Sequence, residues 1–474
     1  MAFGRNLPNF PETVMLHWLH DQNTEYLSQM KLWLSVISGT IFTSTLWAAT
    51  APTPMDQELA YKLVESLTVE VGPRIAGSEA DRRAVQWAVT NLKQLGYDKV
   101  WTEEFEMPGW TRGQASLAVV SPFAQPFVLT SLGGSIGTPA GGITAPVVMF
   151  DSIEALEKAY PALVKGKIVF INKPMAKNKS GSFYGQVVAA RSRGAVEAAK
   201  LGAVAIVIRS VGTSNNRFAH TGTMKYDEAI TKIPAVAISV PDAQNLAKML
   251  ERSPKVELKL QMDNQLQTAT SHNVIAEITG TEKPDEIVLI SGHLDSWDQG
   301  TGALDDGAGV ALAMATGALI KQKGKPKRTI RVVLYGNEEG GLLGARAYAA
   351  KHHKDLAKHV LAAESDFGAG RIWQIESRFG DKALPFAKEL QQKLAHLNIA
   401  LGGNTTYGGP DVSVLAQAGV PVVALSQDGT DYFDYHHTPN DTLDKIDPDS
   451  LKQNLQAWLI MTETVANSTV NLRH

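Results

Sequence analysis

The sequence contains no cysteine. This absence excludes disulfides, thiol nucleophiles, zinc fingers and iron–sulfur clusters, so any metal site must be built from His, Asp and Glu. The sequence also lacks an excess of one charge, because 45 Lys and Arg face 48 Asp and Glu, a net charge of −3 with no long block of one sign. This balance removes the electrostatic case for a nucleic acid or an anionic membrane as partner and favours a small or neutral molecule.

Several catalytic and nucleotide-binding motifs are missing as well. The sequence has no His-Glu-x-x-His helix, no phosphate-binding Gly-Lys-Ser/Thr loop and no dinucleotide glycine fingerprint. Residues 133–137 match the Gly-x-Ser-x-Gly elbow of serine hydrolases, but that elbow needs a helix after it, and here the turn-forming run 138–141 follows. The sequence therefore argues against a serine nucleophile.

Residues 1–51 are expected to be an upstream extension plus a signal peptide that starts at Met30. Lys31 precedes an apolar or small run from Leu32 to Ala51, the pattern of a cleavable secretory signal. The alternatives are a membrane anchor, for which about 20 residues suffice, and a buried helix. Serine and threonine dilute the run, so we expect export to the periplasm or the extracellular space without a stable membrane anchor.

The chain is expected to hold more than one domain, because its 474 residues, 44% of them hydrophobic, exceed the roughly 250–300 at which a single core stops growing. Residues 52–104 show the periodicity of two amphipathic helices. Residues 105–270 alternate short β-branched runs with turns and two helical patterns, which predicts an inserted α/β segment. In residues 271–474 strands alternate with helices, which predicts an α/β fold with a mostly parallel, doubly wound sheet covered by helices on both faces.

Ionisable residues follow the predicted strands of this last part, where ligands of open α/β sheets bind. Each has a simpler explanation when taken alone: Asp305 or Asp306 as a helix N-cap, the Glu338-Glu339 pair as a solvated helix start, His293 as a buried histidine. Their joint arrival at one sheet edge is harder to explain in that way. With the pair His436-His437 they supply the imidazoles and carboxylates that bind zinc without thiolates. By contrast, His352, His353 and His359 lie among lysines, and we expect them to be solvated.

Six motifs together resemble the two-zinc exopeptidases, the family of bacterial leucyl aminopeptidases and glutamate carboxypeptidases. Their order and spacing agree with that family over about 170 residues, and residues 292–309 and the double histidine are most similar to its carboxypeptidase Q branch. Residues 164–169 and 198–202 resemble the protease-associated insert of such carboxypeptidases. The motifs are Gly292–Asp298, Asp305–Gly309, Glu338–Gly340, Glu364–Asp366, Ala418–Pro421 and His436–Thr442, and the segment Arg74–Ser78 extends the resemblance.

The resemblance implies two Zn²⁺ ions per chain and a role for each site residue. One metal would be held by His293, Asp305 and Asp366, and the other by Asp305, Glu339 and His437, so that Asp305 bridges them. Asp295 would accept the other ring N–H of His293. Glu338 would be the general base, and His436 stands where glutamate carboxypeptidases carry a tyrosine that steadies the tetrahedral oxygen.

We therefore expect a zinc-dependent exopeptidase that hydrolyses dipeptides or short peptides with a metal-activated water. The alternatives are a glutaminyl-cyclase-like acyltransferase and a non-enzymatic receptor-like relative on the same fold. The sequence leaves open whether amino- or carboxy-terminal residues are removed, and it makes a homodimer plausible by resemblance only.

Overall fold

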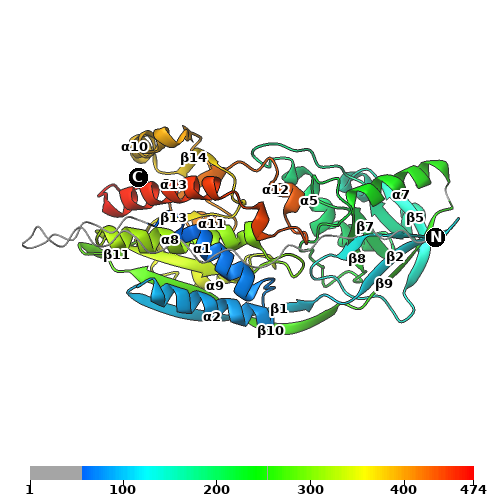
Figure 1. Ribbon diagram of the computed structural model, residues 1–474. Coiled ribbons are helices and arrows are strands. Elements are labelled where there is room, and N and C mark those ends of the chain that lie inside the picture. Colours follow the sequence, from blue (N-terminus) through cyan, green and yellow to red (C-terminus); the bar gives the residue numbers. More distant parts are fainter. Residues whose placement is uncertain (1–55, 254, 474) are drawn as a thin grey trace, which may run out of the picture. The chain divides into compact units, whose positions relative to one another are not determined.

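The computed structural model describes residues 56–253 and 255–473, which build two eight-stranded sheets (Figure 1). The predicted signal peptide lies outside the described residues. The first sheet has the strand order β1-β10-β12-β11-β13-β16-β14-β15 and the second has the order β3-β2-β9-β5-β6-β7-β8-β4.

The first sheet is mixed rather than mostly parallel. Its centre, β12, β11, β13 and β16, runs parallel, whereas β1 and β10 pair antiparallel with their neighbours, and β14 runs antiparallel to β16 but parallel to β15. All eight residues of β12 are buried, as expected for a central strand covered on both faces. The strands are β1 (Lys99–Thr111), β10 (Gln265–Ile278), β11 (Lys283–His293), β12 (Arg328–Tyr335), β13 (His359–Glu364), β14 (Ile372–Arg378), β15 (Ala400–Leu401) and β16 (Val422–Gln427).

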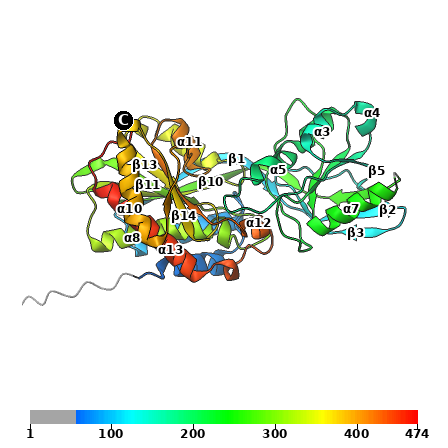
Figure 2. The same cartoon turned by 90° about the horizontal axis from the view of Figure 1, so that it is seen from above.

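Helices cover both faces of the first sheet (Figure 2). Val288 and Ile290 of β11 pack with α8 on one face, while Leu289 packs with α9 and α11 on the other, as the period of two along a strand requires. The first face carries α1 (Leu59–Ser66), α2 (Glu79–Gln94), α8 (Ala308–Lys323), α10 (Leu384–Leu394) and α13 (Pro448–Asn467), and the second carries α9 (Leu343–Lys351) and α11 (Val412–Gln417).

The helical stretch Ala303–Lys323 is long and apolar enough to cross a membrane, but its apolar 18-residue window is buried inside the protein. Its apolar character is that of a core helix, since α8 contacts both the sheet and the helices α1 and α13.

The second sheet is built from the strands between Ala115 and Met262, with α7 on one face and α3, α5 and α6 on the other. It is continuous in sequence with the paired strands β1 and β10, which run in register from Lys99–Glu277 to Thr111–Gln265. The strands are β2 (Ala115–Ser121), β3 (Gln125–Phe127), β4 (Leu129–Ser131), β5 (Ile143–Phe150), β6 (Ile168–Ile171), β7 (Ala205–Arg209), β8 (Ala235–Ile238) and β9 (Glu257–Met262). The helices are α3 (Ile153–Glu157), α4 (Pro161–Val164), α5 (Tyr184–Ser192), α6 (Gly194–Lys200) and α7 (Val240–Arg252).

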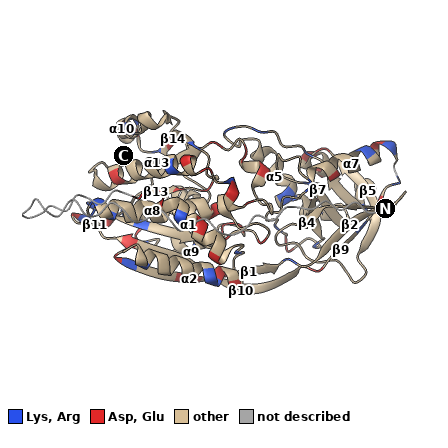
Figure 3. Ribbon diagram, in the orientation of Figure 1, with Lys and Arg blue, Asp and Glu red and all other residues tan. Residues whose placement is uncertain are grey.

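Basic and acidic residues are interspersed along the helices, strands and loops of both sheet regions (Figure 3). Many form local pairs at the surface, for example Lys248 with Glu251 and Lys323 with Glu463. This arrangement matches the balanced composition of the chain.

Candidate metal centre

The predicted site residues meet at the carboxyl edge of the parallel strands. His293 is the last residue of β11, Glu338 and Glu339 follow β12, and Asp366 follows β13. Asp305 lies in the turn Ala303–Gly307 directly before α8. Neighbouring parallel strands end at one edge, so the fold brings together side chains that are far apart in sequence.

The carboxylate of Asp305 lies between two histidines. Its Oδ1 is 3.1 Å from His293 Nε2, and its Oδ2 is 3.2 Å from His437 Nε2. His293 Nε2 also lies 3.5 Å from Asp366 Oδ1, and His437 Nε2 lies 3.0 Å from Glu339 Oε2. The five predicted ligands thus form two groups that share Asp305.

The second ring nitrogen of each histidine faces a main-chain carbonyl. His293 Nδ1 lies 2.9 Å from the Asp295 carbonyl, and His437 Nδ1 lies 3.3 Å from the Thr221 carbonyl. When each Nδ1–H donates to its carbonyl, each Nε2 carries a lone pair that points toward carboxylate oxygens. The lone pair and the oxygens repel each other unless a cation lies between them.

The separations suit a tetrahedral zinc ion. Two bonds of about 2.0–2.1 Å at a tetrahedral angle place ligand atoms about 3.3 Å apart, and the contacts above span 3.0 to 3.5 Å. Asp305 Oδ2 and Glu339 Oε1 are buried without a hydrogen-bond partner among the described residues. The residues present therefore fit two adjacent zinc ions, in donor type and in spacing.

The carboxylates also set the protonation of the site. Burial opposes the charge of His437, but Glu339 and Asp305 outweigh burial and raise the pKa of this imidazole to about 9. A field that attracts a proton this strongly attracts a divalent cation in the same place. Burial, followed by the charge of Asp366, raises the pKa of the Glu338 carboxyl well above its usual value, and cations at the neighbouring ligands would lower it again.

Two further aspartates hold the ligand loops: Asp306, which the sequence offered only as a helix N-cap, and Asp441, to which it gave no role. Asp306 lies near His293 and Asp366, but its two oxygens accept the backbone N–H groups of His293 and Gly309, both at 3.0 Å. Asp441 accepts the N–H groups of Leu304 at 2.7 Å and of Asp305 at 3.2 Å. Asp441 lies inside a quoted motif, whereas Asp306 could be told from Asp305 only by the resemblance.

Asp295 differs from its expected role. The nearest acceptor for the His293 ring is the main-chain oxygen of Asp295, while its carboxylate Oδ1 lies 3.6 Å away and accepts the backbone N–H of Glu338 at 3.0 Å. The side chain of Asp295 thus ties the loop after β11 to the loop that carries the predicted base.

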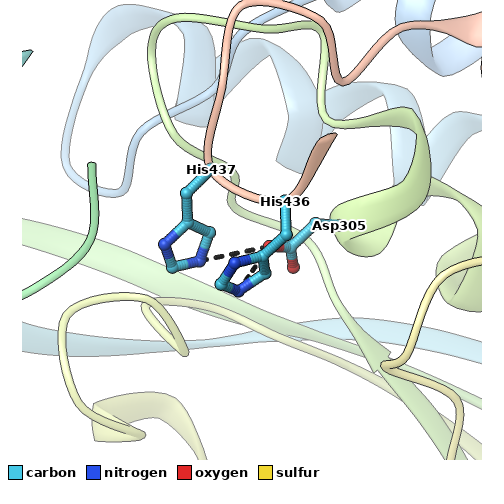
Figure 4. A group of neighbouring side chains, drawn as sticks. All are labelled: Asp305, His436 and His437. Atoms are coloured by element: carbon cyan, nitrogen blue, oxygen red, sulfur yellow. Dashed lines mark ion pairs between the residues drawn. The ribbon is translucent and has the colours of Figure 1, made fainter. Parts of the chain in front are cut away.

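His436 stacks on His437 with ring centroids 3.5 Å apart, and both imidazoles point toward Asp305 (Figure 4). His436 Nε2 lies 3.7 Å from Asp305 Oδ2, farther than the 3.2 Å of His437. Burial, with the charge of His437, holds the pKa of His436 well below its usual value, so this ring is neutral. His437 thus makes the shorter contact with Asp305, and both histidines lie within reach of a metal ion held there.

The second sheet's segment contributes contacts that sequence reasoning missed. The Thr221 N–H donates to the His437 carbonyl at 3.0 Å, and His220 Nδ1 lies 2.8 Å from the His436 carbonyl. Arg191 Nη1 donates to the Thr221 carbonyl at 3.5 Å, beside His437 Nδ1. No local motif marks these residues, because the two histidines that they contact lie more than 200 positions away in the chain.

A cavity of about 520 Å³ has none of the five predicted ligands in its lining, but two residues of its wall adjoin ligands in the sequence. Leu304, which precedes Asp305, and Phe367, which follows Asp366, contribute to its wall together with Tyr432 and Tyr435 of α12 (Tyr432–Tyr435). This volume is in the range of small-molecule sites.

Comparisons with known proteins agree with the site. The model of peptidase family M28 matches residues 273–462. Carboxypeptidase Q of Mus musculus is 38% identical over 87% of this chain and 86% of its own length. The crystal structure of a peptidase M28 precursor from Shewanella amazonensis SB2B superimposes with a TM-score of 0.86 and 52% identity, covering 88% of this chain and 95% of that one.

A zinc aminopeptidase from Bacillus subtilis shares the fold, with a TM-score of 0.64 and 20% identity over 89% of this chain and 98% of that one. The identity and coverage of the carboxypeptidase Q match are high enough to assign the family, a family of two-zinc exopeptidases. The chain belongs to peptidase family M28 and is a metallopeptidase.

Proposed function

We propose that this metallopeptidase binds two zinc ions and hydrolyses dipeptides or short peptides, as a carboxypeptidase Q-like exopeptidase. The observation that carries the proposal is the Asp305 carboxylate, whose two oxygens face the Nε2 atoms of two different histidines. A bridging carboxylate of this kind belongs to sites with two metals rather than one.

Two zinc ions held by His293, Asp305, Asp366, Glu339 and His437 would lower the pKa of a bound water and polarise the scissile carbonyl. Glu338 would be the residue that moves the proton. Its backbone is anchored through Asp295, and its partly exposed carboxylate accepts no hydrogen bond from the described residues. This free carboxylate is suited to take a proton from water and to deliver it to the leaving amine.

The neutral ring of His436 supports a role as hydrogen-bond donor. It is held by the stack on His437 and by contacts with Tyr432 and Phe433, so its orientation is set before substrate binds. We propose that it donates to the oxygen of the scissile carbonyl as negative charge develops there.

Three further proposals follow from the sequence. The segment that carries the second sheet is proposed to be a protease-associated domain inserted into a doubly wound catalytic domain, with boundaries nearer 112 and 264 than 105 and 270, because β1 and β10 belong to the first sheet. We also propose export of the chain after signal cleavage. A homodimer is proposed from the carboxypeptidase Q resemblance.

The test combines metal analysis with a panel of dipeptides that have free or blocked termini. Two zinc ions per chain and hydrolysis that stops with a chelator are expected, and the blocked terminus that abolishes cleavage identifies the end that is recognised. Activity unaffected by chelators would contradict the proposal. Cyclisation of an N-terminal glutamine peptide without peptide cleavage would favour the glutaminyl-cyclase-like alternative.

A further inference from the structure

Arg74 is a fully buried arginine whose guanidinium bonds to main-chain carbonyls. Its relative exposure is 0%, and it lies between α1 and α2 in the motif Arg74–Ser78, which no step of the proposed chemistry uses. Nε donates to the Leu294 carbonyl at 2.6 Å, Nη1 to the Thr301 carbonyl at 2.7 Å and Nη2 to the Gly302 carbonyl at 2.9 Å.

These carbonyls belong to the two loops that carry His293 and Asp305. Leu294 directly follows His293, and Gly302 lies three residues before Asp305. The backbone of Arg74 adds two bonds to the first loop, because its N–H donates to Ser296 Oγ at 3.2 Å and its carbonyl accepts the Ser296 N–H at 3.3 Å. One side chain therefore fixes the distance between the two loops.

Asp441 holds the second loop from its other side. Arg74 donates to the carbonyls of Thr301 and Gly302, while Asp441 accepts from the N–H groups of Leu304 and Asp305. The loop also passes close to Arg74, since Gly302 has φ +60° and a Cβ there would lie 2.8 Å from Arg74 Nη1. The short loop before α8 is thus clamped between a buried cation and a buried carboxylate.

We propose that Arg74 is a positioning residue that sets the zinc affinity of the site, by holding His293 and Asp305 at the separation that a metal ion requires. This inference rests on the proposed two-zinc function. The planar fork of arginine reaches carbonyls of both loops at once, which a lysine ammonium on a flexible stem cannot reproduce. Groups that orient metal ligands typically change metal affinity by about 10- to 100-fold when substituted.

The experiment compares Arg74→Lys with Arg328→Lys. Arg328 is also buried, with 2% exposure, and donates to the carbonyls of Val465 and Val470. It begins β12, on the order of 23 Å along the strand from the end that leads to the site. It is therefore a matched buried arginine without a link to the ligand loops.

Zinc dissociation constants are measured for the full chain by competition with a chelator of known affinity, and folding is followed by circular dichroism. We expect Arg74→Lys to weaken zinc binding about 10- to 100-fold, and Arg328→Lys to leave it within about twofold of the wild type even if its melting temperature falls. A folded Arg74→Lys protein with wild-type affinity would overturn the inference, and so would equal losses in both variants.

If Arg74→Lys does not fold, Asp441→Asn tests the same clamp from the other side. It should weaken zinc binding at least about tenfold, and an unchanged affinity would refute the clamp. Failure of the wild-type chain to bind zinc would instead refute the proposed function, which keeps the two outcomes distinct.

Discussion

Substituting Glu338 by glutamine separates proton transfer from metal binding. The change replaces a carboxylate by an amide of nearly equal size, and it removes no hydrogen bond of the side chain to the described residues. The backbone N–H of residue 338 keeps its bond to Asp295, which is 3.0 Å long in the structure. Folding and the position of the loop should therefore survive.

The expected loss falls on the chemical step. A positioned general base contributes about 10²- to 10⁴-fold to a rate, which corresponds to about 2.7–5.4 kcal/mol of transition-state stabilisation. Glutamine cannot accept the proton of water, so Glu338→Gln should lower kcat by that factor. KM should change little, because the residue's contacts with its surroundings are kept.

The assay pairs dipeptide hydrolysis with zinc content, and Glu339→Gln is the matched control. Glu339 lies next to Glu338 but contacts His437 Nε2 at 3.0 Å, so its loss should remove zinc along with activity. Glu338→Gln should instead retain two zinc ions per chain. A Glu338→Gln enzyme with near-normal kcat would refute the base assignment, and one that had lost its zinc would show that Glu338 is a ligand.

Three other perturbations test the site and the fold. His437→Phe should lose one zinc ion, whereas His436→Phe should keep both and lower kcat; equal zinc content in both variants, measured by metal analysis, would reverse the choice of ligand. Removal of zinc by a chelator should lower the melting temperature, since a ligand at 100 times its Kd stabilises the folded state by about 2.7 kcal/mol. A melting temperature that the chelator leaves unchanged in calorimetry would contradict the proposed metal site. Burial lowers the pKa of His359 from 6.5 to about 4, so between these pH values His359 is protonated in the unfolded chain but neutral in the folded one. The free energy of unfolding should then fall by about 3 kcal/mol between pH 6.5 and pH 4, and denaturant titrations of His359→Gln should show a weaker dependence on pH.

The sequence predicted the candidate site best where ionisable residues follow the ends of strands. His293, Glu339 and Asp366 could be found because each lies a few residues after a run of apolar residues, and such runs form the buried parallel strands β11, β12 and β13. The strand ends then meet at one edge because of the fold's geometry, without any further information from the side chains.

Long-range pairing explains what the sequence did not show. The thirteen-residue strand β1 was missed because its polar residues, Pro108 and Gly109 hide the strand pattern, and only pairing with β10 makes it regular. The C-terminal helix α13 was also not anticipated. The lysine-rich surroundings of His359 suggested a solvated residue, but its exposure is 0% because its ring packs beside Tyr348, which lies 2.8 Å from Nε2.

The site depends on segments that are distant in the chain. Strand ends provide most ligands, the N-terminal segment provides Arg74, and the second sheet's segment provides the Thr221 carbonyl that faces His437 Nδ1 at 3.3 Å. When the Nδ1–H of His437 donates to that carbonyl, Nε2 is free to bind metal. Because Thr221 and His437 are also joined by a backbone hydrogen bond of 3.0 Å, a displacement of the second sheet's segment would move a predicted ligand. The segment is therefore part of the metal centre's structure and not only a cover over it.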